Sequence, residues 1–480
     1  MILVIDVGTT GLRAALVDKN GDVAGLQYRE SPPTSPMPMF VEFDPVRMAA
    51  DALDLARLVL DDGGAVDAVG ITNQRASTIV WDRATGVPVG PGISWQDVRT
   101  AGMCLALQSK GVRLAPNESA TKLAFLLDMA DPNRERDLCF GTIETWIAWT
   151  LSSGAVHVTD PGNAGVTGLM HLDGSGWNEE MCAALDIPMG VLPTIVESSG
   201  IVGHATTLPG SPPIAGLIGD QQGALLGQSC IEPGQAKITF GTGGMLDVCL
   251  GDVRPAFPRV GEAGTFPVIA WRLGGHITWG LESVMMSAGQ AISWLKDDLE
   301  LIATPAESET VARRCDDANG AMFVPALQGL GAPVWDFGAR GTLLGLTRGV
   351  GRPEIVRAVL EGVAHRAVDL VEAAEADGQV SIDRLRVDGG MTANGVFVQA
   401  LANAAQRPVE VSRVREATTL GAAFLAGLAV GTWSDLTECA ATWSPGEVVK
   451  PARKADRAKW LDARDRATKW IPELTALQFF

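Results

Sequence analysis

The sequence has few cysteines, no long apolar run and a shortage of basic residues, and each shortage excludes a class of protein. Its 480 residues include 7 cysteines, an odd number, widely spaced and without a C-x-x-C pair. Neither a disulfide framework nor a zinc site is therefore predicted. No apolar run approaches the ~18 residues of a membrane helix, and Asp6 interrupts the first apolar segment too early for a signal peptide. We expect a cytoplasmic protein with reduced thiols.

The charge balance points to a small-molecule ligand. The formal net charge is -18, which argues against nucleic acid or an anionic membrane as partner, because both require a basic face. The hydrophobic content of 46% is ample for burial, and the length predicts two or three domains.

The stretch Gly219–Gln222 has the highest density of side chains suited to catalysis or ligand binding. It follows the apolar run Ile214–Ile218 and precedes the small-residue segment Gly223–Gly227. This pattern predicts a buried strand that ends where a helix begins, and ligands bind in that crevice of open α/β sheets. Asp220 is the candidate general base. The alternative is that Asp220 only caps the following helix.

Two distant segments share the pattern of strand, Gly-Thr turn and strand. They are Ile2–Ile5, Asp6–Gly11 and Leu12–Val17, and then Ala236–Phe240, Gly241–Gly244 and Met245–Leu250. Such turns direct backbone N–H groups and threonine hydroxyls at an anion, and Asp6 could hold a magnesium ion facing the same phosphates. Together they indicate two similar domains around a shared cleft, although either turn alone could be an ordinary hairpin.

Further polar segments follow predicted strands. Asn73–Ala76 follows the strand Val66–Thr72, and Ser94–Asp97 carries Trp95 among hydrogen-bonding side chains. An aromatic ring with polar neighbours suits a polyhydroxylated ligand, whereas the alternative places Trp95 in the core. Asp388–Asn394 is a third glycine turn able to expose N–H groups to a nucleotide.

Helical patterns cover most of the intervening chain. Asp44 and the following proline begin one helix, and Pro353 begins a long one. We also expect helices over 116–152 and over Ser283–Lys296. The helix Thr419–Val430 is rich in glycine and alanine, which predicts close packing on its neighbours.

In these motifs and their order, the chain resembles the FGGY family of carbohydrate kinases across nearly its whole length, and the glycerol kinases most closely. The matching segments are Asp6–Thr10, Asn73–Arg75, Ser94–Asp97, Gly219–Gln222, Gly241–Gly243, Gly329–Pro333, Asp388–Gly390 and Thr419–Ala423. One family signature fits throughout Gly341–Glu361. In the other, Phe125 stands where tryptophan is usual, which should affect packing only.

The resemblance implies an α/β fold of two actin-like (ribonuclease H-like) ATPase domains, with the active site in the cleft between them. It implies that residues 1–229 bind the carbohydrate and supply the general base, and that residues 230–480 bind the nucleotide. The cofactors it implies are ATP and Mg²⁺, and a homodimer is left open.

The resemblance also implies roles for individual residues. Asp220 would be the general base, and Asp6 and Asp220 would face magnesium. The residues implied at ATP are Thr9, Thr10, Arg13, Thr242, Gly289, Gly390 and Asn394. Those implied at the carbohydrate are Arg75, Trp95, Asp220 and Gln221.

The substrate pocket departs from the glycerol kinase pattern. Ala76 stands where a glutamate that binds a glycerol hydroxyl is usual, and Asn117 and Met245 replace an enclosing tyrosine and phenylalanine. Losing hydrogen bonds to one hydroxyl weakens its binding by roughly 1–3 kcal/mol. We therefore expect a polyol or sugar longer than glycerol. The alternatives are a true glycerol kinase and, from another class, a non-catalytic actin-like nucleotide switch.

Overall fold

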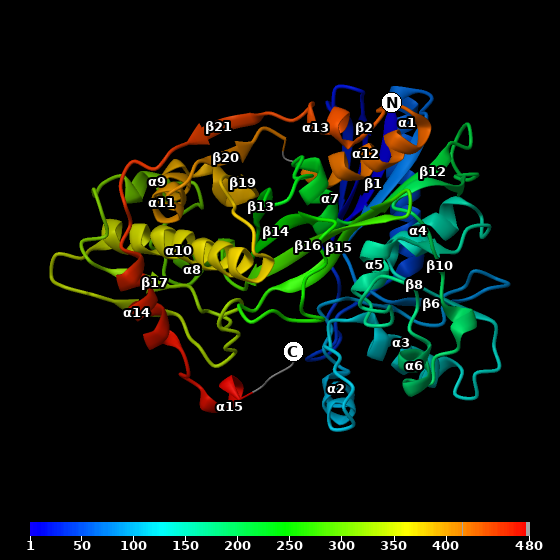
Figure 1. Cartoon of the computed structure of the whole chain (residues 1–480), viewed down its shortest axis with the longest axis horizontal. Coiled ribbons are helices and arrows are strands. Elements are labelled where there is room, and N and C mark those ends of the chain that lie inside the picture. The colour runs from blue at the N-terminus through cyan, green and yellow to red at the C-terminus, as the bar shows by residue number, and fades with distance from the viewer. Residues whose placement is uncertain (415, 477–480) are drawn as a thin grey trace.

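Two mixed β-sheets form the framework of the computed structural model, which describes residues 1–414 and 416–476 (Figure 1). The six-stranded sheet has the order β11-β12-β5-β1-β2-β3 and the seven-stranded sheet the order β15-β16-β14-β13-β19-β20-β21. The first contains β1 (Ile2–Val7), β2 (Gly11–Val17), β3 (Val23–Glu30), β5 (Ala68–Asn73), β11 (Ser199–His204) and β12 (Pro213–Gly219). The second contains β13 (Ala236–Phe240), β14 (Gly244–Gly251), β15 (Phe266–Leu273), β16 (His276–Met285), β19 (Leu385–Asp388), β20 (Val409–Ser412) and β21 (Pro445–Val449).

The two sheets repeat one topology. In the first, β1 pairs antiparallel with β2 and parallel with β5, and β5 pairs parallel with β12. In the second, β13 pairs antiparallel with β14 and parallel with β19, and β19 pairs parallel with β20. Each sheet therefore starts from a hairpin with a glycine turn, and the predicted duplication is confirmed.

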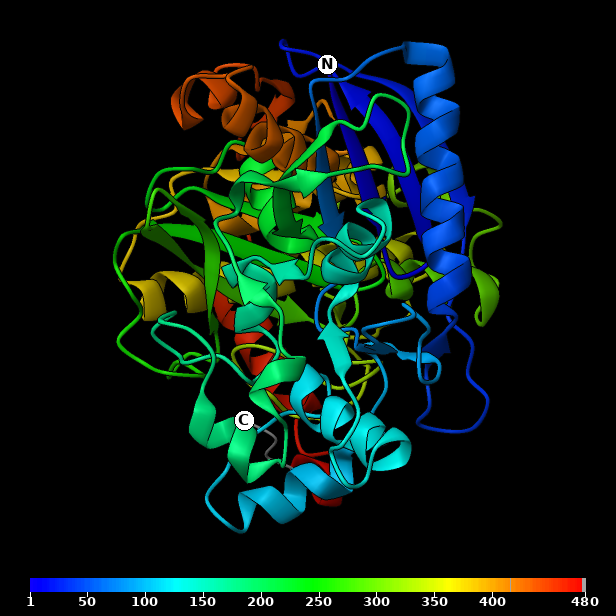
Figure 2. The same cartoon turned by 90° about the vertical axis from the view of Figure 1, so that its right-hand side faces the viewer.

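Helices cover both faces of the first sheet, which explains why its inner strands are continuously apolar. On one face lie α1 (Pro45–Gly63) and α4 (Ile143–Leu151), and Figure 2 shows α1 running along the sheet. The predicted start of α1 is confirmed, because the Asp44 carboxylate accepts hydrogen bonds from two backbone N–H groups of the first turn. On the other face lie α7 (Asp220–Gly227) and α12 (Ala417–Val430), which extend one apolar cluster to the second sheet.

The second sheet packs against the long helix α10 (Arg352–Gly378), together with α8 (Gly289–Asp297) and α11 (Gly395–Ala405). A proline in the first turn of α10 agrees with the predicted start. Around this frame are shorter elements: β4 (Glu42–Phe43), β6 (Ile79–Asp82), β7 (Gly92–Ile93), α2 (Ala101–Gln108), α3 (Ser119–Ala130), β8 (Leu138–Gly141), β9 (Val158–Thr159), α5 (Pro161–Gly165), α6 (Glu179–Ala184), η1 (Met189–Val191), β10 (Thr194–Ile195), α9 (Glu307–Ala312), β17 (Met322–Val324), β18 (Thr342–Leu344), η2 (Gly390–Ala393), α13 (Leu436–Ala440), α14 (Arg457–Ala467) and α15 (Pro472–Thr475).

Two predicted helices are partly wrong. The segment 116–152 is interrupted by β8, which pairs antiparallel with β6. Ser283–Lys296 begins as the end of β16, and the helix α8 starts only at Gly289. Both errors involve short buried apolar runs, whose periodicity does not distinguish a strand from a helix.

The free cysteines agree with the reduced thiols expected from the sequence. All seven cysteines are free thiols, and six of them are buried. Within the described residues, no helix is long and apolar enough to cross a bilayer.

Small residues allow α12, from late in the chain, to lie directly on the first sheet, where Figure 1 draws it beside β1. A Cβ atom on Gly421 would lie 2.0 Å from the carbonyl oxygen of Gly223 in α7. A Cβ atom on Gly70 of β5 would lie 2.5 Å from the carbonyl oxygen of Ala422. The close packing predicted from the composition of α12 is therefore confirmed.

We expect Gly421→Ala to lower the free energy of unfolding by about 1–3 kcal/mol, because the added methyl group overlaps the α7 backbone. The matched control is Gly102→Ala in the helix α2, where an added Cβ would meet no atom within 4 Å. That control should gain up to ~1 kcal/mol from helix propensity. Urea denaturation measures both, and equal effects of the two substitutions would contradict the close packing.

Candidate active site

Asp6 and Asp220 come together where strands of the first sheet end. In the sheet register, both Asp6 of β1 and Ile218 of β12 lie opposite Thr72 of the intervening β5. Asp220 follows as the first residue of α7, and its side chain is 27% exposed. Gly219 occupies the cap position, so the alternative of Asp220 as an N-cap is wrong.

The surroundings of the two carboxylates raise the pKa of both. Burial raises the pKa of Asp6 to about 7, Arg13 partly offsets this effect, and the negative charge of Asp220 raises it further. Burial likewise raises the pKa of Asp220, against the opposing charge of Arg75. One or two carboxylates completed by phosphate oxygens and water are a common magnesium site. This pair fits such an ion, although the described chain has no group of three or more His, Cys, Asp or Glu residues that could hold a metal without such outside ligands.

Arg75 and Trp95 flank the carboxylates. Arg75 Nε lies 3.5 Å from Asp220 Oδ1, and its Nη2 donates to Glu282 Oε2 at 2.5 Å. Trp95 is 38% exposed, and its Nε1 donates to Thr9 Oγ1 at 3.1 Å. The alternative of Trp95 as a core residue is wrong, and the ring contacts the first glycine turn.

The three residues that depart from the glycerol kinase pattern lie on different elements. Ala76 is buried in a left-handed conformation with φ of 59°, and its carbonyl oxygen accepts a hydrogen bond from Ser119 Oγ at 3.0 Å. Asn117 is exposed just before α3. Met245 is half-buried on β14. Ala76 and the start of α3 are therefore neighbours, whereas Met245 belongs to the second sheet.

Beneath the substrate residues lies a fully buried polar network that holds the end of β5. Asn73 Nδ2 donates at 3.0 Å both to Glu144 Oε2 and to Asn163 Oδ1. Glu144 Oε1 also accepts from Thr142 Oγ1 at 2.5 Å and from Thr159 Oγ1 at 2.7 Å. Burial, and next the charge of nearby Asp160, raise the pKa of Glu144 to about 7.

The first glycine turn is closed by a hydrogen bond from Gly8 N–H to the Gly11 carbonyl oxygen at 3.0 Å. Thr10 is exposed at its tip. Arg13 follows on β2, and its guanidinium reaches Asp6 at 3.4 Å and Glu416 at 3.3 Å. Of the three residues predicted at ATP in this half, Arg13 contacts Asp6, and Thr9 and Thr10 lie in the turn that follows β1.

In the second half, the predicted nucleotide residues gather at one end of the sheet. Gly289 N–H donates to the Gly241 carbonyl oxygen at 2.9 Å, which places the start of α8 against the turn that contains Thr242. Gly389, with φ of 93°, lies so close that an added Cβ would be 2.3 Å from the Phe240 carbonyl oxygen. Around Gly390 no atom would lie within 4 Å of an added Cβ, so this turn faces open space.

Asn394 lies farther along the same turn. Its side-chain oxygen accepts from the N–H groups of Val396 and Phe397, and its Nδ2 donates to Ser308 Oγ at 3.0 Å. The carboxamide is thus engaged in capping α11 and in fixing α9.

Three charged residues at this site are not predicted from the sequence: Lys237, Asp247 and Glu282. They lie on β13, β14 and β16, and each has 13% or less of its side chain exposed. The available signal was a charged residue within an otherwise buried strand, which requires a partner. Sequence alone does not name that partner.

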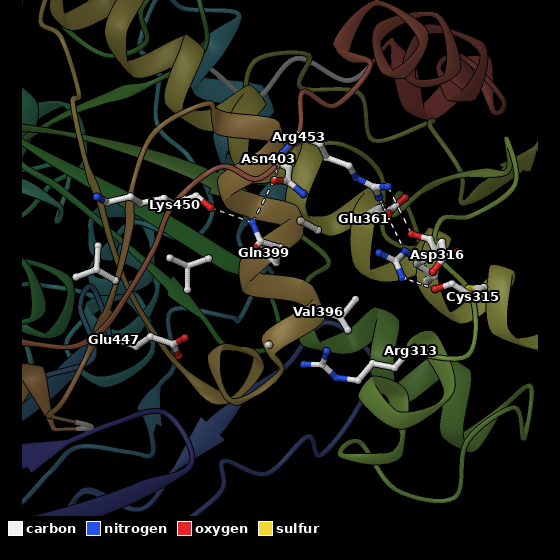
Figure 3. A pocket seen from close by; sticks show the side chains of 15 residues that line it. Arg313, Cys315, Asp316, Glu361, Val396, Gln399, Asn403, Glu447, Lys450 and Arg453 are labelled. Carbon is white, nitrogen blue, oxygen red and sulfur yellow. Dashed lines mark hydrogen bonds and ion pairs between the residues drawn. The ribbon is translucent and has the colours of Figure 1, made fainter.

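A separate cavity of about 730 Å³ lies between α10, α11, β21 and the segment 313–316 (Figure 3). None of the predicted site residues lines it. Three of its charged groups pair with one another, since Glu361 accepts from Arg357 and Arg453, both at 3.0 Å. We assign these contacts to anchoring the C-terminal segment on α10.

Two sheets of one topology, each beginning with a glycine-turn hairpin, and a carboxylate pair where strands of the first sheet end are the features of an α/β kinase of the actin-like, two-domain type. Comparisons with known proteins agree. The FGGY family of carbohydrate kinases matches with its N-terminal domain over residues 1–227 and with its C-terminal domain over residues 237–430. The chain belongs to this family, and it is an ATP-dependent carbohydrate kinase.

Relatives of similar length are glycerol kinases. The chain is 42% identical to glycerol kinase of Aromatoleum aromaticum, over 98% of this chain and 99% of that protein. It is 40% identical to glycerol kinase 2 of Thermotoga maritima, again over 98% and 99%. Among solved structures, glycerol kinase of Plasmodium falciparum with ADP matches with a TM-score of 0.90 and 29% identity, covering 100% of this chain and 99% of that one.

We expect stability to depend on pH through Glu144, whose pKa is raised from 4.5 to about 7. Between these values the folded chain binds a proton that the unfolded chain does not, so the free energy of unfolding falls as pH rises. Glu144→Gln should remove up to ~3 kcal/mol of that fall, at about 1.36 kcal/mol per pKa unit. Urea denaturation from pH 4.5 to 8 measures it, and identical pH profiles for both proteins would refute the assignment.

Proposed function

We propose that the chain transfers the terminal phosphoryl group of ATP to glycerol. The relatives at 40–42% identity over nearly the whole chain are named glycerol kinases. These relatives support glycerol as the substrate better than they support the longer polyol or sugar expected from the sequence. The observation that carries the proposal is the placement of Asp220 at the sheet edge, partly exposed and 3.5 Å from Arg75.

In this proposal Asp220 accepts the proton of the substrate hydroxyl as it attacks the phosphoryl group. The raised pKa of Asp220 makes it a better proton acceptor than an ordinary carboxylate while Arg75 limits that rise. Arg75, Trp95 and Gln221 orient the carbohydrate. A magnesium ion, when bound near Asp6 and Asp220, would neutralise phosphate charge.

The nucleotide is proposed to lie between the two glycine turns. Thr9, Thr10 and Arg13 would contact its phosphates from the first half of the chain. Thr242, Gly289, Gly390 and Asn394 would contact it from the second. In this proposal residues 1–229 bind the carbohydrate, supply the base and contact the phosphates, and residues 230–480 bind the nucleotide.

A second candidate substrate is a polyol or sugar of four or more carbons. It is favoured by Ala76, where a carboxylate acceptor is absent, and by Asn117 and Met245 in place of aromatic rings. These three side chains leave a differently polar pocket with one hydrogen-bond acceptor fewer.

Asp220→Asn should lower the rate of phosphorylation by roughly 10²–10⁴-fold, the usual contribution of a general base, while ATP binding persists. A coupled assay of ADP release measures turnover, and calorimetry measures ATP binding. Asp316→Asn, at the cavity of Figure 3, is the control with unchanged turnover. Near-normal turnover of the Asp220 variant would show that another group accepts the proton.

Substrate choice is tested with glycerol, tetritols, pentitols and ketoses as phosphate acceptors. With glycerol as the best substrate, Ala76→Glu should lower the KM for glycerol roughly tenfold, because it supplies an acceptor worth about 1–3 kcal/mol. Ala76→Met, which adds similar bulk without an acceptor oxygen, is the matched control. A tetritol or longer substrate preferred over glycerol by the wild type would favour the second candidate.

A further inference from the structure

Three neighbouring strands of the second sheet carry one row of buried charges. In the strand register, Lys237 of β13 lies opposite Asp247 of β14, and Asp247 lies opposite Glu282 of β16. Lys237 Nζ is 2.7 Å from Asp247 Oδ2, and both side chains are almost fully buried, with 0% and 2% exposed. Charges in such surroundings are costly unless their partners are well placed.

Both ends of this row reach across to the first half of the chain. At one end, Glu282 Oε2 accepts from Arg75 Nη2 at 2.5 Å, just past the end of β5. At the other end, Lys237 Nζ donates to Gln221 Oε1 at 2.8 Å, on the first turn of α7. Arg75 and Gln221 stand on either side of Asp220 in the proposed site.

Each of these contacts occupies one side of a substrate-binding group and leaves the other side free. Arg75 Nη1 is buried and has no hydrogen-bond partner in the protein, so it is a donor that a substrate oxygen can satisfy. Because the carboxamide oxygen of Gln221 faces Lys237, its NH₂ group points away from that lysine. The row thus leaves N–H donors free beside the Asp220 carboxylate.

We propose that Lys237, Asp247 and Glu282 are positioning residues for the carbohydrate. Glu282 fixes the guanidinium plane of Arg75, and Lys237, balanced by Asp247, fixes the carboxamide of Gln221. The inference rests on the proposed function, in which Arg75 and Gln221 bind the phosphate acceptor. It goes beyond that function because it proposes that residues of the second sheet fix the orientations of Arg75 and Gln221.

Glu282→Gln keeps the shape of the side chain and removes its charge. We expect the KM for the preferred acceptor to rise roughly ten- to hundredfold, as for a weakened hydrogen bond to a charged group, while the KM for ATP stays within about twofold. Lys237→Met combined with Asp247→Leu should raise the acceptor KM less, because it frees only Gln221. The paired change avoids leaving one buried charge without its partner.

The matched control is Glu410→Gln on β20 of the same sheet. Glu410 is also a buried carboxylate paired with arginines, at 2.9 Å from Arg384 and 3.5 Å from Arg386. Its substitution should lower the melting temperature comparably without changing the acceptor KM. Equal acceptor KM values for the wild type, Glu282→Gln and Glu410→Gln, or parallel changes in both substrates' KM values, would overturn the proposal.

A crystal structure of Glu282→Gln separates this proposal from the proposed function, because it requires no turnover. We expect the Arg75 guanidinium to leave the orientation it has in the wild type. An unchanged guanidinium would refute the positioning role even if the enzyme phosphorylates glycerol. A reoriented guanidinium in a protein that phosphorylates no polyol or sugar would instead refute the proposed function alone.

Discussion

The repulsion between two nearby carboxylates, Asp6 and Asp220, is the constraint on which the site depends. The carboxyl ends of β1 and β12 bring them together, and burial makes their negative charges costly. Arg13 and Arg75 each oppose one of these charges. The site therefore has arginines directed at its acids, and the magnesium ion that we propose there would oppose the same charges.

Charges in the interior of the second sheet are connected to the same site. Arg75 balances Asp220 and Glu282 together, so its position couples the proposed general base to a strand of the other sheet. Asp247 lies opposite Glu282 and pairs with Lys237, and Lys237 donates a hydrogen bond to Gln221. The cleft is thus bridged by ion pairs and hydrogen bonds whose members come from both halves of the chain.

Much of the fold could be read from local sequence. The hairpins around Asp6 and Gly241 were predicted because apolar runs interrupted by glycine and threonine have one simple interpretation. Asp220 was found because it follows an apolar run directly. Trp95 could be assigned to the site only once its exposure was known, because an aromatic residue after a strand is equally typical of a core.

The row of charges could not be predicted, for a physical reason. Glu282 and Arg75 are 207 residues apart in sequence, and their contact requires the relative placement of two sheets. Ser283 and its apolar neighbours also fit a helix, which hid the strand β16. The strand register places Asp247 opposite Lys237, and this register cannot be derived from a single sequence.

Because α12 comes late in the chain, the first sheet is synthesised long before the helix that packs on it. Synthesis begins at the N-terminus, so β1, β5 and β12 leave the ribosome long before α12, which packs on one face of their sheet. Until residues 417–430 emerge, that apolar face lacks the helix that packs on it. The first half of the chain therefore completes its core only near the end of translation.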